Sequence, residues 1–194
     1  MDYKDHLGGY CPADSEHPHG DKWTWTPRVW DFLLEKINPK TLLDVGCGEG
    51  HHTKYFLDHN INAYGIDGSE EALHHITIPN ERFILHDFTL GISPNLIDSY
   101  DLIWCCEFVE HIEAQYLDNM LGVLKRGKTV AITHAFPGQG GHHHVNCQYP
   151  GYWIAVLASV GLIYNEALTI ESRKFSTPPE HWNRSGLIFT TRPV

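Results

Sequence analysis

The sequence lacks a long apolar run and a leader segment. Its longest apolar stretches, such as residues 152–160, fall far short of the roughly 20 residues that a membrane-spanning helix needs. The opening residues 1–5 do not show the basic and then apolar pattern of a secretory signal. We therefore expect a cytoplasmic protein with no membrane segment.

Paired cysteines and basic patches are also missing. The five cysteines are an odd number and include no Cys-x-x-Cys pair, which argues against a disulfide framework and against a zinc ribbon. Lysine and arginine total 14 against 24 aspartate and glutamate residues, a formal net charge of −10. Because an acidic surface repels phosphate backbones and no stretch of the chain is basic, nucleic acid is disfavoured as a partner.

The composition suits one folded domain. A chain of 194 residues, of which 42% are hydrophobic and 12% aromatic, can build a packed core. Residues 1–26 are rich in Gly, His, Pro and Trp and have no steady period, so we expect an N-terminal arm or lid ahead of a single domain at residues 27–194. The 15 histidines are unusual, and their protonation below pH ~6.5 would remove much of the negative charge.

Helical patterns and short apolar stretches alternate from Pro27 onward. The helical patterns cover residues 27–37, 51–59, 70–75, 112–124 and 151–159, and the strand patterns cover residues 41–45, 61–66, 82–85, 101–105, 128–134, 162–170 and 186–191. This alternation predicts an α/β fold: a doubly wound, seven-stranded Rossmann-like sheet with helices on both faces. No helical pattern separates the last two strands, so we expect one of them to run antiparallel at the edge of the sheet.

A glycine-rich turn follows the first predicted strand. Residues 44–50 read Asp-Val-Gly-Cys-Gly-Glu-Gly. Glycines let the backbone turn sharply and let a ligand lie against it, and the following helix offers free N–H groups. Asp67 ends the second strand, where an acid accepts hydrogen bonds from both hydroxyls of an adenosine ribose. These features predict a nucleoside cofactor, with a dinucleotide site or a ligand-free turn as the alternatives.

The Asp-x-Gly-x-Gly-x-Gly spacing resembles the class I S-adenosylmethionine-dependent methyltransferases, and the resemblance extends across most of the chain. It implies that Asp44, Gly46 and Gly48 line the methionine portion of the cofactor and that Asp67 binds the ribose. Asp87 and Phe88, after the third strand, look like the family's adenine-side residues. The full set of residues expected to contact the cofactor is Asp44, Gly46, Cys47, Gly48, Asp67, Gly68, Asp87, Phe88 and Cys105.

Acids and histidines follow the fourth predicted strand. Residues 107–111 read Glu-Phe-Val-Glu-His. On one helical turn Glu107, Glu110 and His111 share a face, at the sheet edge where such folds keep their active sites. The loop at residues 134–146 opens at the same edge and contributes more histidines. Two carboxylates and an imidazole form a metal-ligand set.

This Glu-x-x-Glu-His turn, with a loop histidine about 30 residues later, resembles the metal-dependent subset of these enzymes, which includes small-RNA 2'-O-methyltransferases and ubiquinone-pathway O-methyltransferases. The resemblance implies a metal (Mg²⁺, Mn²⁺, Fe²⁺ or Zn²⁺) held by Glu107, Glu110, His111 and His144. Glu107, His111 and His144 are also the candidate catalytic residues, and either histidine could serve as a general base. The alternative is metal-free, because many small-molecule methyltransferases use such a Glu-His pair to close hydrogen bonds around the cofactor.

The expected reaction moves a methyl group to a small-molecule acceptor, with a hydroxyl oxygen favoured. A sulfonium methyl is already activated, so the protein must align the acceptor, exclude water and remove a proton. The aromatic-rich arm and residues 172–185 are the expected acceptor walls. Three alternatives stay open: an RNA-end 2'-O-methyltransferase, a cofactor-binding protein that is non-catalytic or activates a partner, and a nicotinamide enzyme. The sequence does not decide the oligomeric state.

Overall fold

A seven-stranded sheet forms the centre of the molecule. The computed structural model describes residues 5–7 and 9–191, and its strands are ordered β3-β2-β1-β4-β5-β7-β6. The strands are β1 (Thr41–Val45), β2 (Asn62–Asp67), β3 (Phe83–Leu85), β4 (Tyr100–Cys105), β5 (Gly127–Ile132), β6 (Ile163–Tyr164) and β7 (Leu187–Thr190). β7 pairs antiparallel with both of its neighbours, and all other pairs are parallel.

This topology confirms the predicted doubly wound α/β fold with an antiparallel C-terminal strand. The expected position of that strand is wrong, since β7 lies between β5 and β6 and the edge is occupied by β6. The helices are α1 (Pro27–Ile37), α2 (His51–Asp58), α3 (Glu70–Leu73), α4 (Leu117–Leu124), α5 (Pro150–Ser159), α6 (Glu166–Arg173) and α7 (His181–Ser185). None of the helices in the described chain is long and apolar enough to span a bilayer.

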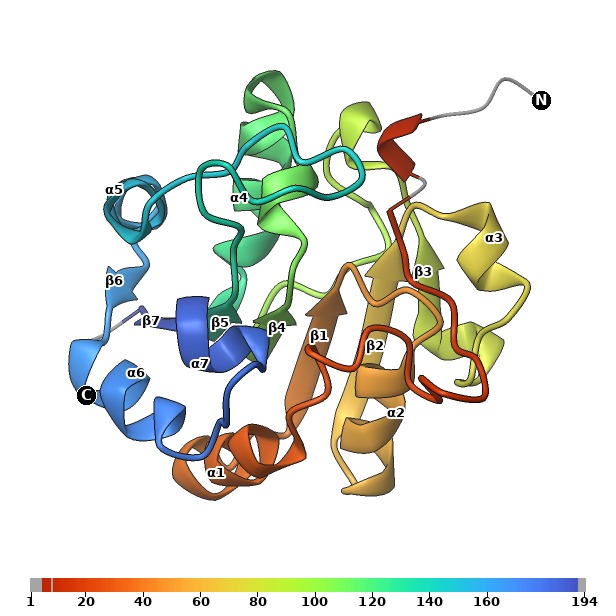
Figure 1. Cartoon of the computed structure of the whole chain (residues 1–194), viewed down its shortest axis with the longest axis horizontal. Coiled ribbons are helices and arrows are strands. Elements are labelled where there is room, and N and C mark those ends of the chain that lie inside the picture. The colour runs from red at the N-terminus through yellow and green to blue at the C-terminus, as the bar shows by residue number, and fades with distance from the viewer. Residues whose placement is uncertain (1–4, 8, 192–194) are drawn as a thin grey trace.

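The helices cover the sheet on both faces because strand side chains alternate. On β4, Leu102 and Trp104 pack with α1, α2 and α7, on the near side of the sheet in Figure 1. Ile103 and Cys105 of the same strand pack into a second core with α4 and α5. Both faces of the central strands are therefore dry, which is why they read as continuous apolar runs.

The segment at residues 162–170 is not the single strand that the sequence predicted. The strand ends at Tyr164, and α6 begins two residues later. The side chain of Asn165 accepts a hydrogen bond from the Leu168 N–H at 3.0 Å, which caps the new helix. Two helices, α6 and α7, thus separate β6 from β7, where we expected none.

The helix expected at residues 112–124 is also shorter than predicted. A 3₁₀ turn (Ala114–Tyr116) precedes α4, which begins only at Leu117. The chain before it, from the end of β4 onward, is therefore irregular. This irregular backbone carries the acids and the histidine that follow β4.

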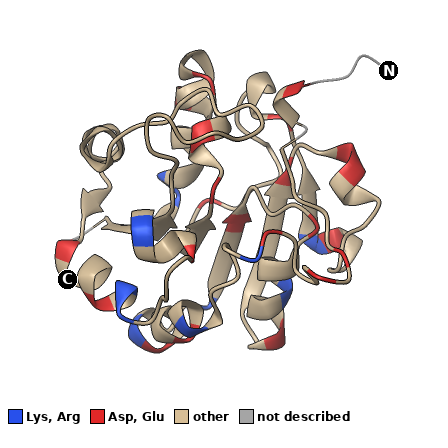
Figure 2. Cartoon of the chain, viewed as in Figure 1, with Lys and Arg blue, Asp and Glu red and all other residues tan. Residues whose placement is uncertain are grey.

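The arm and the β5–α5 loop lie over the carboxyl ends of the parallel strands. Residues 9–26 contain neither helix nor strand and pass in front of β1 and β2 on the way to α1 (Figure 1). A 3₁₀ turn at the start of the arm, Asp5–Leu7, meets the loop, where the Asp5 carbonyl oxygen accepts a hydrogen bond from His142 at 2.7 Å. The loop itself, residues 133–149, contains no Lys, Arg, Asp or Glu and is tan throughout Figure 2.

Candidate functional site

The glycine turn after β1 and the tip of β2 form one hydrogen-bonded unit. Gly46 and Gly48 adopt positive φ angles of 74° and 51°, which glycine reaches without strain. The Gly48 N–H donates to Asp67 Oδ2 at 2.8 Å, and the Ser69 N–H donates to Asp67 Oδ1, also at 2.8 Å. Burial raises the pKa of Asp67, while these N–H groups favour its ionised form. The carboxylate is thus fixed in position beside the turn.

A cavity of about 100 Å³ opens beside Asp67. Gly68, Asp87, Phe88 and Phe108 also line it. The Phe88 and Phe108 ring centroids lie 5.4 Å apart, and Asp87 accepts a hydrogen bond from the Thr89 N–H at 2.9 Å. The structure therefore gathers the predicted ribose-side and adenine-side residues around one cavity.

The arm closes this cavity from outside. His6 Nε2 lies 3.2 Å from both carboxylate oxygens of Asp87, and Leu7 and Tyr10 form part of the lining. A Cβ atom added at Gly68 would lie 2.6 Å from Leu7 and 3.2 Å from the carbonyl oxygen of His86. The turn at Gly68 thus needs the absence of a side chain.

Two of the predicted cofactor residues do not line a cavity. Asp44 is buried beneath the turn, where it accepts a 2.7 Å hydrogen bond from Thr53 Oγ1, and burial raises its pKa to about 7. Cys105 is fully buried in the core. Cys47, by contrast, lines the second cavity, and burial raises the pKa of its thiol.

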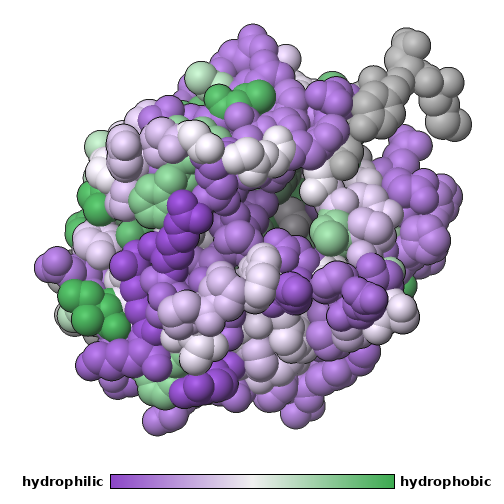
Figure 3. All heavy atoms as spheres, viewed as in Figure 1, coloured by the Kyte–Doolittle hydropathy of each residue, from purple (hydrophilic) through white to green (hydrophobic). Residues whose placement is uncertain are grey.

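The second cavity, of about 340 Å³, adjoins the first. The two share Gly9, Tyr10, Gly46, Glu107 and His111 in their walls. The arm, the glycine turn, the turn after β4 and the β5–α5 loop all contribute to the second cavity. Figure 3 shows this face of the molecule, on which hydrophilic residues predominate. Neither cavity has a lysine or arginine among the described residues that line it.

The turn after β4 is not the single helical turn that the sequence suggested. Glu107 has a left-handed φ of 46°, and only Val109–His111 form a 3₁₀ turn. Glu107 lies beside Glu110 and raises the pKa of that carboxyl, but it is not among the three residues whose potential ligand atoms all lie within 4.8 Å of one another. Glu107 therefore does not join the predicted set of metal ligands in this structure.

Glu110, His111 and His144 do come together. One potential ligand atom from each lies within 4.8 Å of those of the other two. The β5–α5 loop is held there because the Glu110 carbonyl oxygen accepts hydrogen bonds from the N–H groups of Val145 and Asn146, at 3.1 and 2.9 Å. Of the three consecutive loop histidines, His144 is thus the one placed at the cluster, while His142 and His143 pair with Asp5.

Burial shifts the pKa values of two members of this cluster. Glu110 is fully buried, and neither carboxylate oxygen has a hydrogen-bond partner of ordinary geometry in the described chain. Burial, and then the charge of Glu107, raise the pKa of Glu110 well above its usual range. Burial lowers the pKa of His111 to about 4, with the neighbouring His144 adding to the effect. His111 is therefore neutral near pH 7 and has a lone pair to offer.

His144 is oriented by a backbone carbonyl. Its Nδ1 lies 3.2 Å from the Gln139 carbonyl oxygen, which can only accept, so Nδ1 carries the proton and donates. The free Nε2 lone pair is the arrangement usual for a metal-ligating histidine. The absence of a side chain at Gly141 makes room for the ring, because a Cβ atom there would collide with it.

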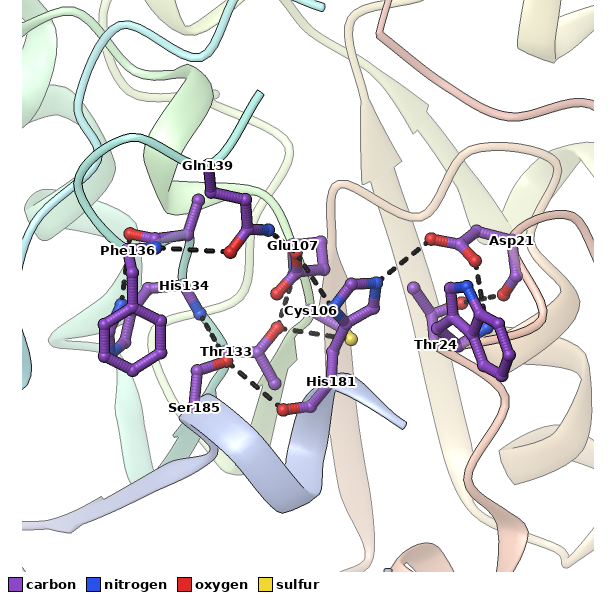
Figure 4. Close-up of polar contacts among 12 residues, drawn as sticks. Asp21, Thr24, Cys106, Glu107, Thr133, His134, Phe136, Gln139, His181 and Ser185 are labelled. Atoms are coloured by element: carbon purple, nitrogen blue, oxygen red, sulfur yellow. Dashed lines mark hydrogen bonds and ion pairs between the residues drawn. The ribbon is translucent and has the colours of Figure 1, made fainter. Parts of the chain in front are cut away.

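Two residues of the second cavity, Asp21 and His181, interact in a way that the sequence did not predict. His181, at the start of α7, lies 3.4 Å from Glu107 Oε2 through Nδ1 and 3.2 Å from Asp21 Oδ2 through Nε2 (Figure 4). From the sequence, Asp21 belongs only to the arm, and His181 belongs only to the expected acceptor wall at residues 172–185. No local pattern could connect them, because they are 160 positions apart.

The comparisons with known proteins agree with this geometry. Residues 43–132, which run from β1 to the end of β5, match the family described as "Methyltransferase domain". A ubiquinone biosynthesis O-methyltransferase of Actinobacillus pleuropneumoniae serotype 7 (strain AP76) is 29% identical over 98 residues, which is 44% of this chain and 42% of that protein. The match thus spans less than half of the relative's length.

Solved structures show the same fold. The TehB-like SAM-dependent methyltransferase from Corynebacterium glutamicum superposes with a TM-score of 0.61 at 17% identity, over 85% of this chain and 86% of that chain. The plantazolicin methyltransferase BpumL, solved with a desmethylPZN analogue and SAH, gives a TM-score of 0.58 at 16% identity, over 85% and 82% of the two chains. The chain therefore has the fold of these two methyltransferases.

Proposed function

We propose that this protein is an S-adenosylmethionine-dependent O-methyltransferase whose acceptor is a small, uncharged molecule. The observation that supports this most is the placement of Asp67. Its carboxylate is held by two backbone N–H groups at the lip of one cavity, and that cavity adjoins a second one lined by Glu107 and His111. A cofactor subsite and an acceptor subsite thus lie side by side.

The residues present fit the cofactor. The cavity walls keep their shape only without side chains at the glycine turn, since a Cβ atom at Gly46 would lie 2.7 Å from Phe108 Cγ. Asp67 accepts the ribose hydroxyls, and Asp87 and Phe88 form the adenine side. The bound cofactor supplies a methyl group already activated on a sulfonium sulfur. The protein's own tasks are to orient that group, to exclude water and to manage the acceptor's proton.

The residues also fit a divalent metal. Glu110 offers two buried oxygens that have no partner of ordinary hydrogen-bond geometry among the described residues, His111 offers a neutral nitrogen, and His144 has its Nδ1 oriented by the Gln139 carbonyl oxygen. Mixed oxygen and imidazole ligands suit Mn²⁺, Fe²⁺ or Zn²⁺ better than Mg²⁺, which prefers oxygen alone. A bound metal would lower the pKa of an acceptor hydroxyl. This cation would also favour the ionised form of Glu110 over the protonated form that burial favours.

Glu107 is the proposed contact to the acceptor. Its Oε1 is buried, faces no hydrogen-bond partner among the described residues, and belongs to the wall of both cavities. A carboxylate oxygen in this position accepts a hydrogen bond from the acceptor hydroxyl and takes its proton as the methyl–oxygen bond forms. In a metal-free enzyme, the nitrogens of His111 and His144 would be available for the same task.

The charge of the cavity walls selects the acceptor class. Asp21, Glu49 and Glu107 line the second cavity without a lysine or arginine among the described residues around them. In the absence of a bound metal these acids would repel phosphate-bearing or carboxylate acceptors, whereas hydroxyl groups can donate hydrogen bonds to them. The cavity of about 340 Å³ accommodates a small ring or a sugar. The partial match to an O-methyltransferase supports oxygen as the accepting atom.

Cofactor binding and methyl transfer are the first test. Calorimetry should show one site for S-adenosylhomocysteine, with at least a tenfold loss of affinity in Asp67→Ala, and no binding of NAD. Transfer of a labelled methyl group should then be measured on catechol, a vicinal-diol sugar and a short RNA. Transfer to catechol or the sugar, but not to RNA, is the expected result. Binding without transfer to any of the three would overturn the enzymatic proposal in favour of a non-catalytic role.

The metal requires a separate titration. Mn²⁺ is titrated into chelator-treated protein that holds S-adenosylhomocysteine, and one stoichiometric site is expected. The double variant Glu110→Ala, His111→Ala should lose that site. The matched control is Glu71→Ala, His75→Ala, which removes an exposed pair 3.4 Å apart on α3 and its following turn. If both double variants retain the site, the metal binds elsewhere and the proposed cluster of Glu110, His111 and His144 is not the metal site.

A further inference from the structure

His181 joins three segments that are far apart in the sequence. Its side chain bridges Asp21 of the arm and Glu107 after β4, at 3.2 and 3.4 Å (Figure 4). Its backbone N–H donates to the Trp23 carbonyl oxygen at 2.9 Å. A single residue at the start of α7 thus contacts the arm by two routes and an acid of the proposed acceptor site by a third.

The two carboxylates act on His181 in the same direction. Burial and the charge of Arg184 lower the pKa of His181. The hydrogen bond with Asp21 and the charges of Glu107 and Asp21 outweigh them, so this pKa is raised above its ordinary value. An imidazolium has two N–H donors, one for each acid. In the imidazolium form, His181 would hold Asp21 and Glu107 together through these two donors, and all three residues lie in the wall of the second cavity.

The bridge leaves one oxygen of Glu107 for a ligand. Oε2 faces His181 and, at 3.4 Å, the side-chain amide of Gln139. Oε1 is buried without a partner in the described part of the chain. The backbone fixes the same side chain from below, because the Glu107 N–H donates to Thr133 Oγ1 at 2.7 Å. The carboxylate is thus oriented through Oε2 by His181 and Gln139, with the Glu110 side chain within hydrogen-bonding reach of the same carboxylate.

We propose that His181 is a positioning residue that couples the docked arm to Glu107, so that the acceptor cavity is complete only while Asp21 is in place. The ligand for the oriented carboxylate is a hydrogen-bond donor, a hydroxyl or an amine of the acceptor. This inference rests on the proposed function for the identity of the acceptor site. The coupling between the arm and Glu107 is independent of it.

The coupling predicts that a change at Glu107 loosens the arm at a distance. The variant Glu107→Asn removes the bridge because its side chain is one methylene shorter and uncharged, and asparagine tolerates the left-handed φ. Trypsin reports on the arm by cleaving after Lys22, an exposed residue next to Asp21. We expect cleavage there, relative to cleavage after Lys54 in α2, to become about three- to tenfold faster.

A double-mutant cycle separates coupling from general loosening. In the His181→Ala background, Glu107→Asn should cause no further increase, because the bridge is already broken while the backbone N–H to Trp23 remains. The matched control is Thr26→Val, which removes a different arm anchor, the 3.0 Å hydrogen bond from Thr26 to Glu180. In that background the effect of Glu107→Asn should persist in full. Equal effects in both backgrounds, or unchanged cleavage in Glu107→Asn, would overturn the proposal.

A spectroscopic measurement covers the case in which Glu107→Asn does not fold. The imidazole ¹⁵N signals of His181, assigned by their loss in His181→Ala, should shift in Asp21→Asn and also respond when Glu107 is replaced conservatively in Glu107→Gln. A response to Asp21→Asn alone would reduce His181 to an anchor for the arm. Binding of S-adenosylhomocysteine and methyl transfer are scored separately, so failure of the proposed function leaves this result readable.

Discussion

The replacement Gly46→Ala tests whether the glycine turn is shaped by its neighbour as well as by its backbone. A Cβ atom at this position would lie 2.7 Å from Cγ and 2.9 Å from Cβ of Phe108, and real Cβ atoms do not approach so closely. The Phe108 side chain must move, and it lines the cofactor cavity. The variant should therefore lose both stability and cofactor affinity.

The magnitude follows from two contributions. Alanine at a φ of 74° costs about 1–2 kcal/mol, because the left-handed region crowds Cβ. Overpacking against Phe108 adds roughly 1–3 kcal/mol. The free energy of unfolding should thus fall by about 2–5 kcal/mol. The affinity for S-adenosylhomocysteine should fall by tenfold or more, which corresponds to a loss of about 1.4 kcal/mol or more in binding free energy.

Gly161 supplies the matched control. Its φ of 87° is similar, but nothing lies within 4 Å of an added Cβ, and it sits after α5, outside both cavities. Gly161→Ala should carry only the backbone cost of about 1–2 kcal/mol and leave calorimetric binding unchanged. Urea denaturation and titration of S-adenosylhomocysteine measure both quantities. Equal stability losses with unchanged binding in both variants would refute the argument from Phe108.

Three further predictions concern pH and the histidine cluster. Burial raises the pKa of Asp44 to about 7, so the folded state holds this proton more tightly than the unfolded state, and the free energy of unfolding falls as the pH rises from 4 to 7. The variant Asp44→Asn lacks this loss. Relative to wild type, its free energy of unfolding in urea should therefore rise by about 2 kcal/mol between pH 5 and pH 8. His52 gives the opposite pH dependence. Burial lowers its pKa to about 3, so the free energy of unfolding falls as the pH drops below 6.5. In His52→Gln the decrease between pH 7 and pH 5 should be smaller by about 2 kcal/mol. Gly141→Ala should displace the His144 ring and weaken Mn²⁺ binding at least tenfold, whereas Gly140→Ala, which has open space around its Cβ, should not.

The fold was largely readable from the sequence because its signals are local. Buried parallel strands are short apolar runs, and the glycine turn and Asp67 mark the ends of two of them. The single strand predicted at residues 162–170 is wrong for a local reason as well, because Asn165 followed by Glu166 is a capping pattern typical of the start of a helix. Because α6 begins at Glu166, directly after its N-cap Asn165, β6 ends at Tyr164 after two residues.

The site could be predicted only in part from the sequence, because the contacts that complete it join residues that are far apart in the chain. The positive φ of Glu107 breaks the single helical turn that would have placed it on one face with Glu110 and His111, and nothing in the spacing of these residues indicates such a reversal. The choice of His144 among three consecutive histidines depends on hydrogen bonds from Val145 and Asn146 to Glu110, which form only in the folded chain. The contact of Asp21 with His181 depends on the whole topology.

The meeting of Asp21 and His181 has a consequence for biosynthesis. The two residues are 160 positions apart, and ribosomes add roughly 5–20 residues per second, so Asp21 leaves the ribosome about 10–30 s before its partner exists. During that interval the sheet from β1 to β5 can assemble, but the arm has neither His181 nor Glu180 to bind. A nascent chain can therefore present the glycine turn to solvent and bind the cofactor before the acceptor cavity closes. Synthesis itself sets the order in which the two subsites mature.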